Sequence, residues 1–477
     1  MHLSPTSRER VLNLAARICK EEPRLDQKAA FGASVTSGLG PWPALVIEDH
    51  SSISLFETEG NLAYSYRALL LASAGDLVVV AAPSSKAFED YCAGSLGLGR
   101  PEVLVLKPSN NVLSLAEMAA ADAPLFERLV ERAGDAGGLG IVTYMGSADV
   151  WQLAGRISHA ARVPVKVAAA PPALTRRVND KLWFAKCVAD LLGQQALPAT
   201  AGAYGLATLV GRIIEMEDTH ESLAIKLTRS ASSAGNYLLD LKRIKGMSAR
   251  GLYAWLEERF HALGWSGRFP VIVTSWERPV LSSPSVQLWL PERKHGPPIV
   301  EGIFDQIIVG DTAVFSGAEP SRLSEHLQQR LANEAAHIGL LFQYLGYFGR
   351  CSFDSILVGQ SLDTAELLWV ECNGRWGGVS IPMTLANRLL GDWRKVWPVV
   401  VEGYSMARPP RGLNSILSDL SGELYDSTYQ SEGAVILSPG RLEAAQGYEF
   451  LVLDRTREAA LARAARVSTK LQGTGSA

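Results

Sequence analysis

Cysteine, long apolar runs and an excess of one charge are all scarce in this sequence. The 477 residues include five cysteines with no C-x-x-C spacing, which argues against a disulfide framework and against a cysteine zinc site. No uncharged apolar run approaches the length of a membrane span, and charged residues interrupt the N-terminal stretch where a signal peptide would be apolar. We therefore expect a cytoplasmic protein without a membrane partner.

Other function classes are disfavoured in the same way. The formal net charge is −3, so no overall basic field would recruit nucleic acid. The eight histidines show no H-E-x-x-H or other metal-ligand spacing. The nearest approach to a G-x-G-x-x-G motif runs from Gly94 to Gly99. Because no strand leads directly into it, it fits a helix end better than a dinucleotide site.

The length predicts two to four domains, and the first third reads as α/β. Apolar runs closed by proline at 76–83 and 102–108 are typical of parallel strands buried on both faces. Further strands are expected at 140–144 and 163–169, helices at 7–20, 84–93, 124–133 and 149–161, and a loop at 31–43. The alternation predicts an α/β domain over residues 1–172.

The stretch around which the chain is organised is a strand at 366–371 that ends in polar residues. Glu371 and Asn373 are two apart, so they share one face of an extended segment, and Arg375 continues the alternation. Carboxylate and amide oxygens suit Mg²⁺, while an arginine holds phosphate or carboxylate bidentately. The plainer interpretation is a surface hairpin with ordinary polar residues.

A second carboxylate precedes this strand. Asp354 lies on a predicted strand at 353–358, which a hairpin at 359–364 would pair with the strand at 366–371. Asp354 would then lie beside Glu371 and Asn373, giving three oxygen ligands on two adjacent strands. Cys372 would point to the opposite, buried face.

Two lysines upstream have surroundings that suit phosphate. Lys181 lies in the first turn of a helix expected at 178–193 and capped by Asn179 or Asp180. Lys226 lies on a strand that runs into a loop of small residues at 230–236, whose N–H groups could fold over phosphates. The commoner alternative is a solvated lysine and an ordinary serine-rich loop, and the spacing is not that of a P-loop.

The remaining central elements complete an ordered series. Helices are expected at 240–263 and 323–345, and strands at 270–275, 285–290 and 299–309. After a linker at 409–412, strands at 433–439 and 448–454 and a helix at 456–471 predict a small α+β domain over residues 403–477. The arginines of that last helix are expected on its solvated face.

The order of these motifs resembles the ATP-grasp fold over residues 173–402, and the preceding region resembles a pre-ATP-grasp domain. The fold expected is thus a multidomain chain with an α/β pre-ATP-grasp domain, an ATP-grasp domain and a small C-terminal α+β domain. The resemblance implies ATP and Mg²⁺ as cofactors, with Asp354, Glu371 and Asn373 as metal ligands. The positions that it assigns to the nucleotide are Lys181, Lys226, Ser232, Ser233, Gly235, Thr274, Ser275, Trp276 and Glu277.

The sequence departs from the family pattern at two points. Many relatives carry an arginine two residues before the strand aspartate, where this chain has Ser352. Arg375 or Arg293 is therefore expected to neutralise the reacting phosphate. The hinge has Thr274 and Ser275 where an acidic residue is common, and Glu277 is the nearest substitute for a ribose contact.

Within the superfamily the chain is most similar to peptide ligases of the pheganomycin type, through Ser283-Pro-Ser-Val-Gln, Val300-Glu-Gly-Ile-Phe-Asp-Gln and Asn373-Gly-Arg-Trp-Gly-Gly. This similarity implies an enzyme that activates an amino-acid carboxylate as an acylphosphate and joins it to the amine of a short peptide, in peptide antibiotic biosynthesis. The alternatives are a ligase for small metabolites such as an amino acid or polyamine, and a nucleotide-binding regulatory protein without turnover. A homodimer is the expected assembly, because dimers are the commonest oligomers.

Overall fold

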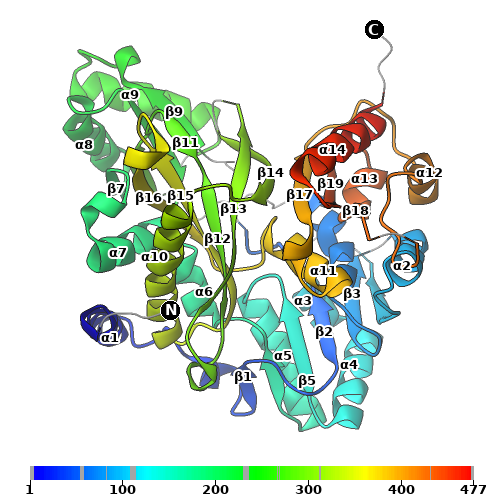
Figure 1. The fold of residues 1–477 in the computed structure, drawn as a ribbon. Coiled ribbons are helices and arrows are strands. Elements are labelled where there is room, and N and C mark those ends of the chain that lie inside the picture. Colours follow the sequence, from blue (N-terminus) through cyan, green and yellow to red (C-terminus); the bar gives the residue numbers. More distant parts are fainter. Residues whose placement is uncertain are drawn as a thin grey trace.

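The computed structural model describes residues 5–53, 59–81, 83–107, 114–228, 236–265, 267, 269–310, 313–429 and 431–473. Within these ranges the chain forms three β-sheets with helices packed between and around them (Figure 1). None of the described helices combines the length and apolar character needed to cross a membrane. The mixed α/β multidomain organisation predicted from the sequence is confirmed.

The first sheet is wholly parallel and lies in the N-terminal third. Its strands, in spatial order, are β1 (Val35–Ser37), β6 (Val165–Val167), β5 (Leu139–Thr143), β2 (Ala44–Ile47), β3 (Leu77–Ala81) and β4 (Glu102–Leu106). Its connecting helices are α2 (Lys86–Gly94), α3 (Leu115–Ala121), α4 (Ala123–Ala136) and α5 (Ala148–Ala161). The loop predicted at 31–43 was wrong in part, because β1 pairs along the edge of the sheet beside β6.

Both faces of this sheet are covered, as the continuous apolar runs predict. Leu77 and Val79 are fully buried and pack in one cluster with residues of α3, α4 and α5. Val78 and Val80 point the other way and pack in a second cluster with Phe450 and other residues of the C-terminal strands. The C-terminal region therefore closes the second face of the N-terminal sheet.

The second sheet is antiparallel and carries Lys226. Its spatial order is β7 (Thr200–Ala203), β10 (Val271–Ser275), β8 (Ser222–Leu227) and β9 (Asn236–Asp240), with α8 (Leu206–Glu217) and α9 (Ala249–Ala262) packed against it. The helix predicted at 240–263 begins only at Ala249. Gly246 adopts a φ of +78°, which breaks the chain direction, and Ser248 then caps α9 by accepting a hydrogen bond from Gly251 N.

The third and largest sheet runs from the central region into the C-terminal region. Its main path is β11 (Val280–Ser282), β15 (Gly349–Val358), β12 (Pro284–Leu290), β13 (Ile299–Val309), β14 (Val314–Pro320), β17 (Trp397–Gly403), β19 (Tyr448–Asp454) and β18 (Gly433–Ile436), and β16 (Glu366–Asn373) pairs with β15. Because β17 pairs with both β14 and β19, the sheet is continuous across the boundary expected at residue 403.

The other helices lie on the edges of these sheets or between them. They are α1 (Pro5–Glu21), α6 (Pro172–Val178), α7 (Lys181–Leu192), α10 (Glu325–Tyr344), α11 (Ser380–Leu390), α12 (Leu413–Asp419), α13 (Pro439–Glu443) and α14 (Arg457–Gln472). The 3₁₀ helices of the described residues are η1 (Lys28–Phe31), η2 (Glu59–Leu70), η3 (Gln194–Ala196), η4 (Leu241–Arg243), η5 (Arg293–His295), η6 (Leu362–Thr364) and η7 (Trp393–Lys395).

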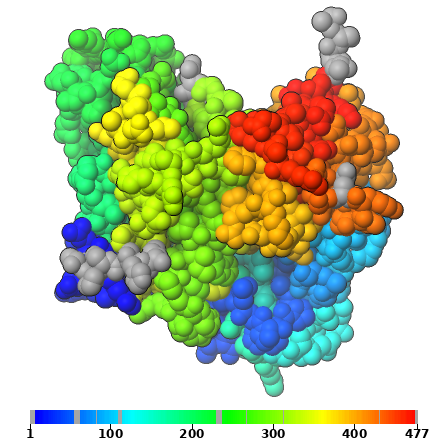
Figure 2. Space-filling view, viewed as in Figure 1, coloured from blue at the N-terminus to red at the C-terminus, as the bar shows by residue number. Residues whose placement is uncertain are grey.

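The arginines of α14 are only in part on a solvated face: Arg466 is 51% exposed, as expected, whereas Arg463 is 15% exposed, and all three are paired with carboxylates. Arg457 forms a forked pair with Glu319 of β14, with N–O distances of 2.6 and 2.7 Å. Arg463 and Arg466 both donate to Glu423. These pairs fix α14 against the large sheet and the preceding loop. Viewed as in Figure 2, a notch separates the upper part of this red and orange region from the green region that carries the second sheet.

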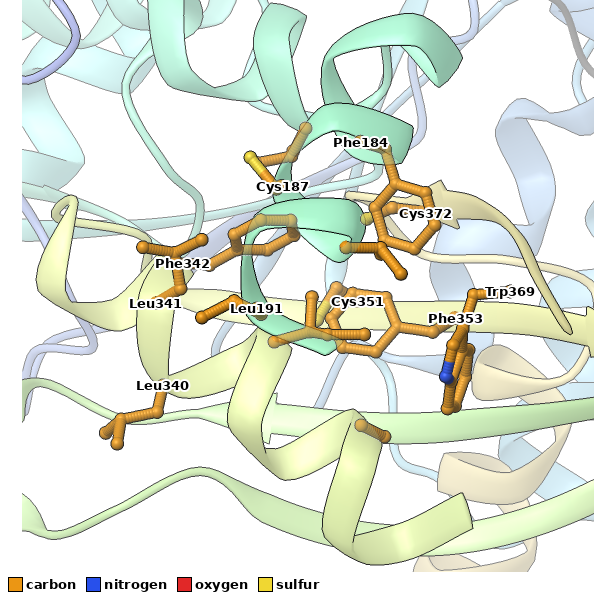
Figure 3. Close-up of a cluster of buried hydrophobic side chains, with 14 of the residues drawn as sticks. Phe184, Cys187, Leu191, Leu340, Leu341, Phe342, Cys351, Phe353, Trp369 and Cys372 are labelled. Atoms are coloured by element: carbon orange, nitrogen blue, oxygen red, sulfur yellow. The ribbon is translucent and has the colours of Figure 1, made fainter. Parts of the chain in front are cut away.

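A buried cluster supports the strands that carry Asp354 and Glu371 (Figure 3). Phe353 lies at the centre of this cluster, with its ring centroid 5.6 Å from that of Phe342 on α10 and 5.8 Å from that of Phe184 on α7. Cys372 is 5% exposed and belongs to the same cluster, which confirms the prediction that it is a core residue. Residues adjacent in sequence to the candidate ligands thus anchor them from behind.

Leu341→Ala tests this support. Leu341 is fully buried in the cluster, so we expect the variant to lose about 2–5 kcal/mol of unfolding free energy through a cavity that its neighbours fill only in part. Urea denaturation would measure the loss. Leu263→Ala is the control, because Leu263 is 50% exposed, and its change should stay within about 0.5 kcal/mol. Equal losses in both variants would contradict the central position of the cluster.

Candidate active site

The register of β15 and β16 brings the three predicted oxygen ligands together. Asp354 is the direct partner of Glu371, and Asn373 is the partner of Ser352, two positions along. A register shift follows Asp354, so the strand is irregular where the polar side chains begin. The hairpin pairing predicted from the sequence is therefore confirmed, while the binding of a metal by these residues stays a prediction.

Asp354 is held by hydroxyl and amide donors. Its Oδ1 accepts a hydrogen bond from Ser285 Oγ at 2.6 Å, and its Oδ2 accepts one from Asn373 Nδ2 at 2.9 Å. Burial, and then the negative charge of Glu371, raise the pKa of Asp354 to about 6. A cation bound between the two carboxylates would reduce their mutual repulsion and so lower this pKa.

Glu371 is balanced by Lys181, which the sequence identified as a phosphate ligand. The Nζ of Lys181 lies 2.9 Å from Glu371 Oε2, and both side chains are largely buried. Burial alone would raise the pKa of Glu371, but the charge of Lys181 and its hydrogen bond outweigh burial and lower that pKa. Asp180 caps α7 by accepting from Leu182 N and Trp183 N, which fixes the helix start that carries Lys181.

Two hydrogen bonds between the side chain of Asn179 and the backbone of Gly374 hold the end of β16 against α6. Asn179 Oδ1 accepts a hydrogen bond from Gly374 N at 3.0 Å, and Asn179 Nδ2 donates to Gly374 O at 3.3 Å. A Cβ at position 374 would lie 2.3 Å from Val178 Cγ2. The glycine in the Asn-Gly-Arg stretch therefore allows a close approach between two segments that are far apart in the sequence.

Arg375 reaches from β16 to the N-terminal domain. Its Nη2 donates to Asn373 Oδ1 at 2.7 Å, and its Nη1 donates to the hydroxyl of Tyr144 at 2.9 Å. Tyr144 follows β5 directly, so the guanidinium joins the large sheet to the C-terminal edge of the parallel sheet. This fixed charge beside Asn373 is well placed to hold a phosphate or carboxylate.

Lys226 lies on β8 across the cavity from these strands. Its Nζ is 5.6 Å from the centroid of the Trp276 ring. Burial lowers the pKa of Lys226 to about 8, and the nearby charge of Lys181 acts in the same direction. The negative charge of Glu371 opposes this shift only in part. A buried ammonium that is poorly balanced in this way would be stabilised by an anion such as a phosphate.

The two lysines open on a cavity with a volume of about 660 Å³. The hinge residues Thr274, Ser275, Trp276 and Glu277 line one side of it, and Asp354 and Glu371 line the other. Ser275 Oγ donates to the carboxylate of Glu277. Thr274 Oγ1 is 3.0 Å from Thr200 Oγ1. A cavity of this size, with charged groups on one side and hydroxyl, aromatic and carboxylate side chains of the hinge on the other, fits a nucleotide.

Arg293, a described residue that was selected from the sequence, does not line this cavity. Arg293 lies in η5, near the far end of β12, where its guanidinium stacks 4.1 Å from the ring centroid of Tyr344. Its selection as a phosphate-neutralising residue is corrected, because Ser285, which touches Asp354, lies near the start of β12, and Arg293 lies beyond the other end of that strand. Ser232, Ser233 and Gly235 lie outside the described residues.

The residues present fit a divalent cation only with help from the nucleotide. In the part of the chain that the structure describes, no three His, Cys, Asp or Glu side chains are grouped so that they could hold a metal ion by themselves. Asp354 and Glu371 supply two carboxylates, and Asn373 adds an amide whose nitrogen, not its oxygen, is turned toward Asp354. This donor set is that of Mg²⁺ shared between a protein and phosphate oxygens.

Two smaller cavities adjoin the same groups. One, of about 170 Å³, is lined by Asp354, Glu371, Asn373 and Arg375 on one side and by residues of the N- and C-terminal regions on the other. The second, of about 190 Å³, is lined by Lys181, Glu371 and Asn373 together with the N-terminal end of α5. Glu371 lines all three cavities.

Several residues of this site escaped sequence reasoning. Tyr144 and His50 follow β5 and β2, at the C-terminal edge of neighbouring parallel strands, where ligands of open α/β sheets bind. Tyr144 follows a strand that was predicted, so that rule could have selected it. His50 follows a strand that was not predicted. Asn179 was considered only as a helix cap, and Ser285 only as part of the Ser283-Pro-Ser-Val-Gln stretch and not as a partner of Asp354.

Comparisons with known proteins agree with this geometry. A family model for the pre ATP-grasp domain matches residues 65–158. No curated protein sequence matches the chain. The fold is similar to that of N5-carboxyaminoimidazole ribonucleotide synthetase from Thermus thermophilus, with 16% identity and a TM-score of 0.51 over 90% of this chain and 99% of that one.

Two further solved structures are biotin carboxylases. The enzyme from Campylobacter jejuni, in a β-γ-ATP complex, has 13% identity and a TM-score of 0.52 over 91% of this chain and 90% of that one. The biotin carboxylase domain of the Hydrogenobacter thermophilus 2-oxoglutarate carboxylase, a dimer with MgADP, has 12% identity and a TM-score of 0.51 over 91% of this chain and 89% of that one. The chain therefore has an ATP-grasp-like fold with an N-terminal pre-ATP-grasp domain.

Gly374→Ala tests the close contact between the end of β16 and α6. The added methyl group would overlap Val178, so we expect a loss of about 1–3 kcal/mol of unfolding free energy and a lower melting temperature. Gly211→Ala is the matched control, because Gly211 lies in α8 with open space around it, and alanine should stabilise that helix by about 0.5–1 kcal/mol. A Gly374→Ala variant as stable as the wild type would show that the two segments are not tightly joined.

Proposed function

We propose that the chain is an ATP-dependent carboxylate–amine ligase that works with Mg²⁺. The observation that carries the proposal is the meeting of three cavities at Glu371. A ligase of this kind must bring together a nucleotide, an acid and an amine, and each cavity offers room for one of them. A protein that only bound a nucleotide would have no need of the two smaller cavities.

The reaction has two balanced steps. In the first, a carboxylate oxygen of the acid attacks the γ-phosphorus of ATP, the bond from that phosphorus to the bridging oxygen breaks, and ADP leaves. In the second, the amine nitrogen attacks the acyl carbon, the bond from carbon to the phosphate oxygen breaks, phosphate leaves, and the nitrogen loses a proton. Both steps depend on positioning and charge neutralisation, so neither needs a covalent protein nucleophile.

The residues of the large cavity take the nucleotide. Thr274, Ser275, Trp276 and Glu277 lie where adenine and ribose would bind, and Lys181 and Lys226 lie where the phosphates would bind. Mg²⁺ held by Asp354, Glu371 and Asn373 would offset negative charge on the phosphates. Arg375, bonded to Asn373, lies beside these ligands and would stabilise the charge of the transferring phosphoryl group.

For the substrates we propose an amino-acid carboxylate and the amine of a short peptide. The likeness to pheganomycin-type ligases supports this choice, and with it a role in peptide antibiotic biosynthesis. The second candidate is a ligase for small metabolites. It is favoured by the sizes of the two smaller cavities, about 170 and 190 Å³, each suited to one small group and not to a long chain.

The decisive assay is formation of a hydroxamate. Hydroxylamine is a small nucleophile that can replace the natural amine, so it traps an acylphosphate without requiring the acceptor to be known. We expect ADP release and a hydroxamate when ATP, Mg²⁺, hydroxylamine and the correct member of a panel of amino acids and short peptides are combined. ATP binding with no hydroxamate from any acid would contradict the proposal.

Removing the charges at the centre should abolish turnover and keep the fold. Glu371→Ala and Lys226→Ala are each expected to lower the ADP release rate by about 100-fold or more, because each removes charge that positions or balances the phosphates. Glu366→Ala is the matched control for Glu371→Ala, since Glu366 lies on the same strand at its exposed end. Near-normal ADP release in either site variant would overturn the assignment of these residues.

A further inference from the structure

The smaller cavity of about 170 Å³ ends at a charged cluster that the reaction steps above do not use. At one end it reaches Asp354, Asn373 and Arg375. At the other end its lining comes from Tyr64 and Arg67 of η2, Glu402 of β17 and Glu449 of β19. A molecule in this cavity would touch both the reacting centre and the joint between the N- and C-terminal regions.

Arg67 is the core of this charged cluster. Its Nη1 donates to both oxygens of Glu449 at 2.8 Å, and its Nε donates to Glu48 Oε1 at 2.6 Å. Glu48 also accepts from His50 Nε2 at 2.9 Å. The three charged side chains are almost fully buried, with exposed fractions of 2–4%. Their fixed geometry makes this end of the cavity rigid.

Glu402 is the second charged group at this end. Its Oε1 accepts from Arg441 Nη1 at 2.8 Å, and the Arg441 guanidinium lies against the rings of Tyr64 and Tyr404, 5.2 and 5.5 Å from their centroids. Arg441 therefore fixes the orientation of Glu402, which also lines the cavity of about 170 Å³.

The charges in this cluster do not balance. Glu48, Glu402 and Glu449 supply three carboxylates, whereas Arg67 and Arg441 supply two guanidinium groups. Burial lowers the pKa of His50, so its ring adds no positive charge near pH 7. One carboxylate charge is thus left without a cation, and burial together with the charge of Glu449 raises the pKa of Glu402 to about 7.

The lining of the whole cavity is also rich in carboxylates. It holds Arg67 and Arg375 against Glu402 and Glu449, together with Asp354 and Glu371, which are the proposed Mg²⁺ ligands. The cavity of about 190 Å³ on the other side of Asn373 has the opposite balance, with three cations against two carboxylates: Arg176, Lys181, Arg375, Asp149 and Glu371. A cationic substrate and an anionic substrate would therefore separate between the two cavities.

We propose that the acceptor enters the 170 Å³ cavity as a primary ammonium and is held there by Glu402, while the carboxylate substrate takes the cavity beside Arg176. This assignment rests on the ligase function proposed above and adds the chemistry by which each substrate is recognised. It predicts that an acceptor with an uncharged or acidic head group binds more weakly than a cationic one. One proton passes from the ammonium to the Glu402 carboxylate before the nitrogen attacks the acyl carbon.

Glu402→Gln is the first test. The amide keeps the size of the side chain and can still accept from Arg441, but it removes the charge. We expect the KM for the cationic amine to rise about tenfold or more, with the KM values for ATP and for the acid within about twofold of wild type. Hydroxamate formation with saturating hydroxylamine, which is uncharged near neutral pH, should be preserved and shows that the variant is folded.

Glu319→Gln is the matched control. Glu319 lies on β14, which pairs with β17, and its side chain is 12% exposed and bound to Arg457, much as that of Glu402 is 13% exposed and bound to Arg441. It does not line the cavity. All three KM values should therefore stay at the wild-type level.

Arg176→Gln gives the reciprocal test and should raise the KM for the acid while the KM for the amine is unchanged. An unchanged amine KM in Glu402→Gln, in a variant that still forms the hydroxamate, would overturn the amine site and leave the ligase function standing. Absence of hydroxamate in the wild-type protein with every acid would overturn the ligase function, and with it the acceptor assignment.

Discussion

The pairing of Asp354 with Glu371 is the constraint on which the site depends. It places two carboxylates side by side in a buried position, which is unfavourable unless positive charge is supplied. The chain supplies it from distant segments. Lys181 forms an ion pair with Glu371, and Arg375 donates a hydrogen bond to Asn373. Ser285 and Asn373 in turn donate hydrogen bonds to Asp354. These partners come from α7, from the end of β16 and from β12, so the pair draws the central segments together. The same demand for positive charge is what Mg²⁺ and a nucleotide would meet during the proposed reaction.

Arg67 joins the N- and C-terminal regions through buried ion pairs. Its pairs with Glu48 and Glu449 connect β2, η2 and β19, and the apolar faces of β3 and β19 pack together beside them. The C-terminal region is therefore more than a cap, because it forms one wall of the small cavity next to Asp354. The fold alone is what this chain shares, at 12–16% identity, with the solved structures named above, so the wall formed by the C-terminal region has to be judged from its own residues.

Much of the fold and the centre of the site could be predicted from the sequence, because they depend on local patterns. Short stretches of sequence are enough to predict the alternation around Glu371 and Asn373, the position of Asp354 one hairpin earlier, and the position of Lys181 at a helix start. The residues that escaped prediction are those brought in by tertiary packing. Arg67 is separated by hundreds of residues from Glu402 and Glu449, and nothing near them in the sequence shows that they meet. Arg293 was selected by charge alone, and the direction of β12 carries it away from Asp354.

The transfer of oxygen from acid to phosphate tests the central claim most directly. An acid labelled with ¹⁸O in its carboxylate would be incubated with the enzyme, ATP, Mg²⁺ and an amine, and the released phosphate analysed by mass spectrometry. If the carboxylate attacks the γ-phosphorus and the bond from carbon to the phosphate oxygen later breaks, each phosphate carries one labelled oxygen from the acid. Phosphate without label would mean that water, and not the acid, receives the phosphoryl group, and would contradict the acylphosphate mechanism built on Asp354, Glu371 and Arg375.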